Sequence, residues 1–313
     1  MVPEVRIPIS PTPSFLNRAL LLAASIRKFH PESIIRVYLG QEGGASPEAV
    51  KRVMEAFAGK RIGFEWVSAK NFAEWDGTRS PYLATMNQRF NTAVDGDAVI
   101  IADCDVIVTG PLDELFETHA VQGVQAHVAP LPYADMRYLW AICSAPWPED
   151  LIRFTGLGIM DTPMTEAPPY PNSGFVYAPK DLFLRMVPLY HDAIWRLKNA
   201  MRDTYWFDQL ALGIAIAGSH VTYQPLGLHF NFPNQAEFDE RHPINLEHVR
   251  VIHYLRENFI NRTTDFESAT AVHRLTQRRD LTGSHEVLRQ ALMRNVGILE
   301  PVGLGGPEDV PWA

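Results

Sequence analysis

The sequence predicts an α/β fold with a mostly parallel central sheet flanked by helices, followed by a helical C-terminal extension. Over the first hundred residues, strand-like segments alternate with segments whose apolar residues have helical spacing. The run from Ala98 to Val108 is apolar except for two aspartates, as expected of a central strand buried on both faces. With 313 residues, 46% hydrophobic and 20% charged, the chain can bury a large core. Together these observations favour βαβ units.

Prolines mark the boundaries of the N-terminal elements. Pro11 and Pro13 end the first strand, and Pro31 stops the helix that follows. Ser46 is a suitable N-cap, and Pro47 suits the first helical position. Right-handed crossovers would place the strands in one sheet. The expected strands are Val5–Ile9, Ile34–Leu39 and Phe64–Val67, and the expected helices are Phe15–Phe29, Pro47–Ala58 and Pro81–Ala93.

The second half contains a long segment of Gly, Pro and Thr between Leu157 and Pro171, which predicts a loop that could close over a ligand. The chain is polar and helical from Asn261 to Arg294, and the tail after Leu299 is rich in Gly and Pro. The expected elements between these segments are strands at Phe175–Tyr177 and Val249–Tyr254 and helices at Leu182–Ala200 and Trp206–Ala217.

Charge and cysteine content exclude several classes of protein. A formal net charge of −8 without any basic run argues against a sequence-independent nucleic-acid binder, so a bound nucleotide should be small and bridged by a metal. Cys104 and Cys143 are the two cysteines, and the N-terminus resembles no signal peptide, which favours the cytoplasm. The longest apolar run near the N-terminus, Ala19–Ile26, is too short for a bilayer, so we expect peripheral membrane contact at most.

Asp103 and Asp105 lie at the carboxyl end of the predicted central strand, where open α/β sheets bind ligands. Two close carboxylates repel each other unless a cation neutralises them, and Mg²⁺ or Mn²⁺ accepts such hard oxygen ligands. Alternatively, the two acids cap the next helix or face solvent, because a short motif of this kind also occurs by chance. Cys104 between them is expected to pack inward as a small hydrophobic residue.

The context of this motif resembles a known family. The stretch Arg89–Phe116, in which an arginine-bearing helix leads into a hydrophobic strand ending in Asp-x-Asp, resembles the GT-A fold glycosyltransferases, above all the retaining family eight. Residues 172–174, Asn-Ser-Gly before FVYAP, resemble that family's Asn-small-Gly step into a strand. Asp208 and Gln209 resemble its Asp-Gln pair on a later helix. The resemblance covers Val5 to His253.

The resemblance implies a Rossmann-like GT-A domain, which binds a nucleotide sugar and carries catalysis, over residues 1–260. Residues 261–313 would then be the helical C-terminal extension and tail. A divalent metal, Mn²⁺ or Mg²⁺, would bridge the diphosphate of the donor. The implied metal ligands are Asp103, Asp105 and His253. The implied donor-binding residues are Arg89, Asn172, Ser173 and Gly174, and the implied catalytic residues near the anomeric carbon are Asp208 and Gln209.

Each implied role has a simpler alternative. Arg89 could be a surface charge, and Asn172 a turn residue. Asp208 could cap a helix or form an ion pair, and His253 could be a structural residue within a strand. The chain also departs from family eight after His253, where HYLRENFIN lacks the family's Gly and Lys-Pro-Trp step. Arg256 is the cation that could replace the missing lysine.

The acceptor is expected to contact aromatic side chains, because sugar rings stack on them. The run LHFNFP, Leu228–Pro233, is predicted to be a loop at the site. Aromatic residues crowd the later half, and most are expected to be core. The candidates for an acceptor site are Trp140, Trp147, Tyr170, Tyr205, Trp206, Phe230 and Phe232.

The resemblance implies a metal-dependent transfer of a sugar from a nucleotide-diphosphate donor, with a UDP-sugar favoured, to a hydroxyl of a saccharide or other acceptor. It favours retention, although a carboxylate base would also permit inversion. One alternative is a phosphohydrolase of the haloacid dehalogenase type, whose nucleophilic Asp-x-Asp strand usually starts the chain and carries Thr or Val where Ile107 stands here. A second alternative is a non-catalytic module that binds nucleotide sugars.

Overall fold

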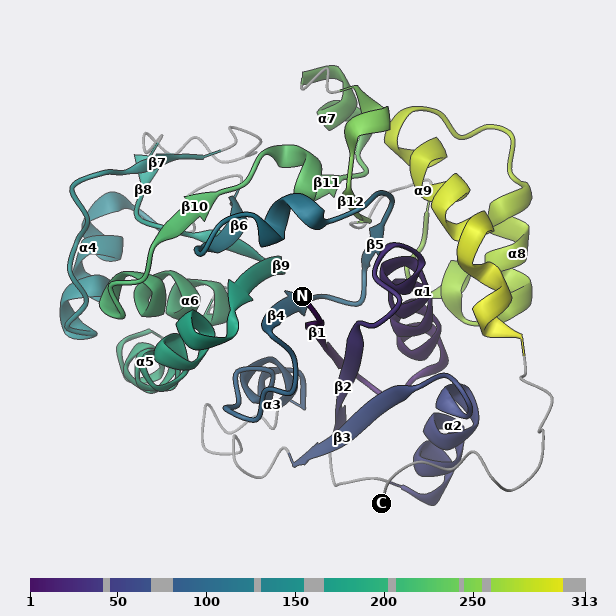
Figure 1. Ribbon diagram of the computed structural model, residues 1–313, viewed down its shortest axis with the longest axis horizontal. Helices are drawn as coiled ribbons and strands as arrows, with labels where there is room; N and C mark the ends of the chain where they lie inside the picture. Colours follow the sequence, from purple (N-terminus) through teal and green to yellow (C-terminus); the bar gives the residue numbers. More distant parts are fainter. Residues whose placement is uncertain are drawn as a thin grey trace.

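The computed structural model describes residues 1–41, 46–68, 81–126, 131–154, 166–201, 207–241, 245–254 and 260–300. Its centre is a seven-stranded sheet in the order β10-β6-β9-β4-β1-β2-β3 (Figure 1). Strand β9 is antiparallel to its neighbours β4 and β6, and all other neighbouring pairs are parallel, which confirms the mostly parallel sheet. The strands are β1 (Pro3–Ile9), β2 (Ile34–Gln41), β3 (Ile62–Ser68), β4 (Ala98–Ala102), β6 (Val121–Gln125), β9 (Pro171–Pro179) and β10 (Tyr223–Pro225).

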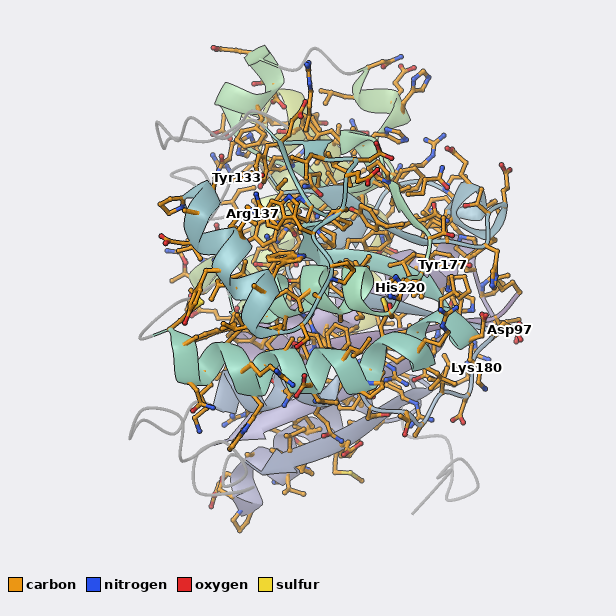
Figure 2. The ribbon with its side chains drawn as sticks, turned by 90° about the vertical axis from the view of Figure 1, so that its left-hand side faces the viewer. Asp97, Tyr133, Arg137, Tyr177, Lys180 and His220 are labelled. Carbon is orange, nitrogen blue, oxygen red and sulfur yellow. The ribbon has the colours of Figure 1, made fainter. Side chains whose placement is uncertain are left out.

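Helices cover both faces of the sheet, so the molecule has three layers. Ile100 of β4 packs with α1 and α2 on one face, and Val99 and Ile101 pack with α4, α5 and α6 on the other. This alternation explains why β4 is apolar throughout. Figure 2 shows α4 and α5 on the second face, with Tyr133 and Arg137 on α4. The helices are α1 (Pro13–Phe29), α2 (Pro47–Phe57), α4 (Tyr133–Ile142), α5 (Lys180–Ala200) and α6 (Phe207–Gly218).

The N-terminal elements begin and end close to where the prolines predict. Helix α2 starts at Pro47, and the side chain of Ser46 accepts a hydrogen bond from the backbone N–H of Ala49 at 3.2 Å. Helix α3 (Pro81–Gln88) is shorter than the predicted helix, which was expected to continue to Ala93. Beyond its end, the backbone carbonyls of Arg89, Asn91 and Ala93 accept hydrogen bonds from the side chain of Arg6 in β1. They therefore do not accept the backbone N–H groups of a further helical turn.

The prediction of one strand from Ala98 to Val108 is wrong. The chain turns at Asp103–Asp105, between β4 and β5 (Val106–Val108), and these two strands belong to different sheets. Strand β5 pairs antiparallel with β12 (Val251–His253), which pairs with β11 (Phe232–Pro233). Because both β4 and β5 are fully buried, the sequence is equally apolar on either side of the turn.

Strand β9 is longer than the predicted strand Phe175–Tyr177, and the prediction that Asn-Ser-Gly precedes the strand is wrong. It begins at Pro171, so residues 172–174 lie inside the strand and do not precede it. The predicted loop 157–171 falls mostly on residues 155–165, outside the described residues. Its described part includes β8 (Glu166–Ala167), which pairs with β7 (Ile152–Arg153).

The expected C-terminal helical extension is present, and the boundary at residue 260 stays a prediction. Leu21 of α1 and Ile252 of β12 share one hydrophobic cluster with Phe266 and Leu288 of the extension. Figure 1 shows α8 and α9 beside α1. The tail 301–313 lies outside the described residues. The remaining elements are α7 (Ala236–Arg241), α8 (Ala269–Gln277), α9 (Gly283–Asn295) and the short helices η2 (Asp113–Phe116), η3 (Leu228–Phe230), η4 (Leu246–His248), η5 (Thr264–Phe266) and η6 (Val296–Leu299).

Among the described helices, none has the length and apolar character that a bilayer crossing needs.

Candidate functional site

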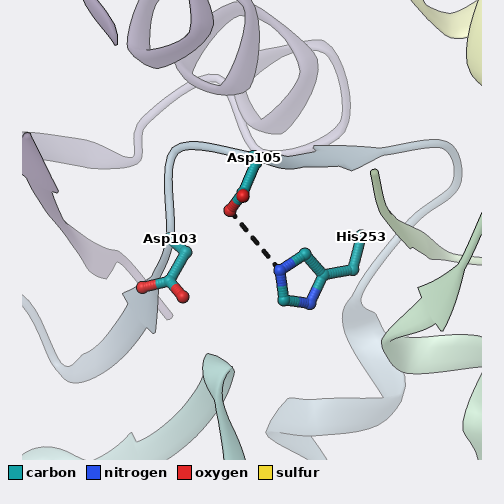
Figure 3. Close-up of side chains that lie close together, drawn as sticks. All are labelled: Asp103, Asp105 and His253. Carbon is teal, nitrogen blue, oxygen red and sulfur yellow. Dashed lines mark ion pairs between the residues drawn. The ribbon is translucent and has the colours of Figure 1, made fainter. Parts of the chain in front are cut away.

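Two strand pairings bring the predicted metal ligands together at the carboxyl end of β4. The backbone N–H of Asp103 donates to the carbonyl of Gly174 at 2.9 Å, which extends the β4–β9 ladder to the first aspartate. The β5–β12 pairing places His253 opposite Val106, next to Asp105. As a result, Asp103, Asp105 and His253 each offer a ligand atom, and these atoms lie within 4.8 Å of one another (Figure 3).

The chemistry of these three side chains fits a divalent cation such as Mn²⁺ or Mg²⁺. Two carboxylates supply hard oxygen ligands, and one imidazole adds a nitrogen that Mn²⁺ also accepts. Nε2 of His253 lies 3.4 Å from Oδ1 of Asp105. Asp105 and His253 are buried, whereas the side chain of Asp103 keeps 23% of its surface exposed. The cluster is therefore held by the fold and still open on the Asp103 side.

Arginines neutralise the two carboxylates unequally. Asp105 contacts Arg262 and lies 4.0 Å from Arg18 of α1. Burial alone would raise the pKa of Asp105, but the hydrogen bond and charge of His253, with the two arginines, outweigh burial and lower it. Burial raises the pKa of Asp103 to about 6. The positive charge of Arg89, whose guanidinium lies 3.0 Å from Oδ1 of Asp103, opposes this increase. Asp103 is thus the carboxylate whose charge is less well compensated.

Arg89 is fully buried, so the alternative that it is a surface charge is wrong. Its guanidinium contacts Asp103 at 3.0 Å and Asp208 at 3.2 Å. The backbone carbonyl of Arg89 accepts a hydrogen bond from Arg6, which forms a buried ion pair with Glu4 at 2.8 Å. The β1 strand therefore fixes the segment that carries Arg89.

Asp208 and Gln209 lie in the first turn of α6 and contact the start of β9. Oγ of Ser173 donates to Oδ2 of Asp208 at 3.0 Å, and the backbone N–H of Ser173 donates to Oε1 of Gln209 at 3.4 Å. Asp208 is thus an ion-pair partner of Arg89, and the same guanidinium also contacts the candidate metal ligand Asp103.

Asn172 and Gly174 connect β9 to His253 through a residue that the sequence did not single out, Asn231. Oδ1 of Asn172 accepts from the N–H of Gly174 at 2.9 Å and from Nδ2 of Asn231 at 3.0 Å. Oδ1 of Asn231 lies 3.0 Å from Nδ1 of His253. The LHFNFP run does reach the site, but as η3 and β11 with Asn231 between them.

Gly174, which the resemblance implies is a donor-binding residue, has a steric reason to be glycine. A Cβ at this position would lie 2.6 Å from Cε1 of His253 and 2.8 Å from Oδ1 of Asn172. Glycine therefore lets His253 and Asn172 pack against the β9 backbone.

Most of the aromatic residues proposed to contact an acceptor lie in the core, and Trp147 is only half-buried. Arg18 and Arg262 were missed because their partners are distant in sequence, and Asn231 was predicted only as part of the LHFNFP run. Tyr205, Trp206 and Arg256 lie outside the described residues. The aromatic candidates found in the core are Trp140, Tyr170, Phe230 and Phe232.

Known structures share this fold. The chain resembles an active-site mutant of LgtC with a TM-score of 0.57 and 16% identity, over 96% of this chain and 98% of that chain. A second structure, galactosyltransferase LgtC with donor and acceptor sugar analogues, matches with a TM-score of 0.52 and 17% identity over the same shares of the two chains. The apo glycosyltransferase GlyE of Streptococcus pneumoniae has a TM-score of 0.51 and 14% identity, over 96% of this chain and 62% of GlyE.

No protein-family model matches the sequence, and no curated protein sequence matches it. The likeness to solved structures therefore concerns the fold, and it confirms the GT-A fold that the sequence predicts.

Proposed function

We propose that this protein is a metal-dependent glycosyltransferase that transfers a sugar from a nucleotide-diphosphate donor, a UDP-sugar in the favoured case, to an acceptor hydroxyl. The observation that carries the proposal is the convergence of Asp103, Asp105 and His253 at the carboxyl end of β4. In an open α/β sheet, ligands bind at this edge. The fold shared with LgtC and GlyE supports the same reading.

The charges around the site support an anionic ligand that arrives with a cation. Among the residues that the structure describes, six charged side chains of the site balance formally, because three arginines face three aspartates. A divalent cation would add two positive charges, and a nucleoside diphosphate would compensate them. The charged groups are Arg18, Arg89 and Arg262 on one side and Asp103, Asp105 and Asp208 on the other.

The proposed reaction breaks the bond between the anomeric carbon and the diphosphate oxygen, and it forms a bond from that carbon to the acceptor oxygen, whose proton is lost. A bound divalent cation would offset the charge that develops on the departing diphosphate. The residues that would hold the cation are Asp103, Asp105 and His253.

The chain's other residues would orient the donor. Arg89 would contact the donor sugar or phosphate, and it holds Asp208 in place. Asp208 and Gln209 would line the sugar near the anomeric carbon, with one carboxylate or amide oxygen steadying the positive charge that develops there. Asn172, Ser173 and Gly174 would form the wall of the donor pocket along β9. We favour retention because Asp208 and Gln209 resemble the Asp-Gln pair of family eight.

The phosphohydrolase and the non-catalytic module can both be distinguished from a glycosyltransferase. The phosphohydrolase is not favoured, because β4 follows three other strands along the chain and the shared fold is that of glycosyltransferases. The non-catalytic module would bind a nucleotide sugar without turning it over, and the absence of the Lys-Pro-Trp step is its support.

The test is a panel of UDP- and GDP-sugars, each incubated with the full chain in Mn²⁺, in Mg²⁺ and in chelator, with release of the nucleoside diphosphate measured. We expect slow hydrolysis of one or more donors in the presence of metal, and faster release when a saccharide acceptor is added. Binding that is detected by calorimetry without any release would instead identify the non-catalytic module. Equal release in chelator and in metal would refute metal dependence.

A further inference from the structure

A continuous line of hydrogen bonds joins the metal cluster to the donor-facing strand. It runs from the N–H of Gly174 to Oδ1 of Asn172, then to Nδ2 of Asn231, and from Oδ1 of Asn231 to Nδ1 of His253. The three distances are 2.9, 3.0 and 3.0 Å. Asn231 is buried, with 3% of its surface exposed, between η3 and β11. Its side chain hydrogen-bonds to both Asn172 and His253.

The direction of every bond in this line follows from one backbone group. The N–H of Gly174 can only donate, so the atom of Asn172 that faces it must be the oxygen. This oxygen then accepts from the NH₂ group of Asn231, which turns the oxygen of Asn231 toward His253. Since that oxygen can only accept, Nδ1 of His253 must carry a proton.

The direction of these hydrogen bonds determines which atoms of His253 and of Asn172 can bind a ligand. With its proton on Nδ1, a neutral His253 has the lone pair of Nε2 free to ligate a metal ion in the cluster, where Nε2 lies 3.4 Å from Oδ1 of Asp105 (Figure 3). Oδ1 of Asn172 already accepts two hydrogen bonds, so the group that Asn172 can offer to a sugar is its NH₂ donor.

We propose that Asn231 is a positioning residue that sets the tautomer of the metal ligand His253 and, at the same time, the amide orientation of the donor-facing Asn172. The inference rests on the proposed function, because it assigns a metal to one end of the line and a donor sugar to the other. It identifies Asn231 as the residue that couples metal binding to donor binding.

Two substitutions separate the two tasks of Asn231. Asn231→Asp keeps an oxygen that accepts from His253 but replaces the NH₂ group that donates to Asn172. Asn231→Ala removes both contacts. Asn172→Ala removes only the donor end, and Asn295→Ala removes a buried asparagine of α9 that bonds Ala291 of its own helix at 2.7 Å, which makes it the matched control.

The experiment measures Mn²⁺ affinity of the full chain by electron paramagnetic resonance without nucleotide, followed by hydrolysis of the donor found active above. We expect Asn231→Ala to weaken Mn²⁺ binding about tenfold or more, as losses of groups that orient metal ligands do, and to slow hydrolysis. Asn231→Asp should bind Mn²⁺ within about threefold of wild type and still lose about tenfold in hydrolysis, matching Asn172→Ala. Asn295→Ala should change neither quantity.

Two results would overturn the inference and leave the proposed function standing. One is wild-type Mn²⁺ affinity in folded Asn231→Ala. The other is an equal loss of Mn²⁺ affinity in Asn231→Asp and Asn231→Ala, which would mean a packing role only. If Asn231→Ala does not fold, the Asn231→Asp variant tests the inference alone. Either wild-type hydrolysis or weakened Mn²⁺ binding in Asn231→Asp would then contradict the two separate tasks proposed for Asn231. A wild-type protein that binds no Mn²⁺ overturns the proposed function itself.

Discussion

Asp105 and Asp208 are equally buried, with 8% of each residue exposed, yet the fold treats their charges differently. Asp208 is held by Arg89, which is fully buried, and by the hydroxyl of Ser173. Asp105 contacts Arg262, whose side chain is 23% exposed, and His253, and it lies 4.0 Å from the buried Arg18. From this difference we propose two tasks. Arg89 would keep Asp208 oriented, and a cation could replace Arg262 at Asp105.

The largest effect should come from Asp105→Asn, which removes the cation ligand and keeps the shape. We expect donor hydrolysis in Mn²⁺ to fall at least a hundredfold, because a preorganised electrostatic contact to the leaving group is lost. Without metal, the free energy of unfolding should fall by about 2 kcal/mol, since Arg262 and Arg18 lose their charged acceptor. Asp181→Asn, an exposed aspartate that pairs with His119, is the control. An active but destabilised Asp105→Asn variant would contradict the metal site.

Asp208→Asn should sharpen the comparison by separating turnover from metal binding. The amide keeps the contact with Ser173 but removes the negative charge that Asp208 offers to Arg89. We expect hydrolysis to fall about ten- to hundredfold, with Mn²⁺ affinity within about threefold of wild type and a folded protein. Unchanged turnover, or a protein that does not fold, would show that Asp208 serves the fold alone.

The pH dependence of metal binding tests the less compensated carboxylate, Asp103. Its pKa is raised to about 6 by burial, despite Arg89, and a carboxyl group must lose its proton to ligate a metal. Mn²⁺ affinity should therefore be constant above that pKa and should fall about tenfold per pH unit below it. Calorimetric titrations between pH 5 and pH 8 would measure this, and affinity that is independent of pH across that range would contradict the assignment of Asp103.

The smallest effect, and the one with the opposite sign, should come from Arg262→Ala. This arginine contacts Oδ2 of Asp105 and would compete with a bound cation for that oxygen. Without it, Mn²⁺ should bind about two- to fivefold more tightly in the absence of nucleotide, while UDP should bind less tightly in the presence of Mn²⁺. Arg278→Ala, whose guanidinium pairs with Asp280 away from the cluster, is the control. Weaker metal binding in Arg262→Ala would show that the arginine supports the metal site and does not compete for it.

The sequence predicted the elements whose signals are local. Helix α2 followed from Ser46 and Pro47, and the α1 region followed from the prolines around it. The single strand from Ala98 to Val108 was wrong because burial on both sides of the turn leaves the hydrophobic pattern unbroken. Local patterns do not reveal a change of sheet when both sheets are buried.

The candidate site was predictable only where a motif carried it. Asp103 and Asp105 stood out at the end of an apolar run, and His253, Asn172 and Asp208 came from the family resemblance. The residues that contact them had no such signal, since a buried arginine or asparagine is recognised by its partner, and the partners lie far away in sequence. Arg18 and Arg262, which contact Asp105, are such residues. Asn231, which contacts His253, was indicated only by the LHFNFP run around it.

The central claim is that a divalent cation held by Asp103, Asp105 and His253 brings a nucleoside diphosphate to the carboxyl end of β4. Isothermal titration of UDP into the full chain, in Mn²⁺ and in chelator, tests it most directly, because binding needs no acceptor and no turnover. The account predicts measurable affinity in Mn²⁺ and at least a tenfold loss in chelator, since the diphosphate would then meet the carboxylates without a cation between them. Equal affinity for UDP in Mn²⁺ and in chelator would contradict it.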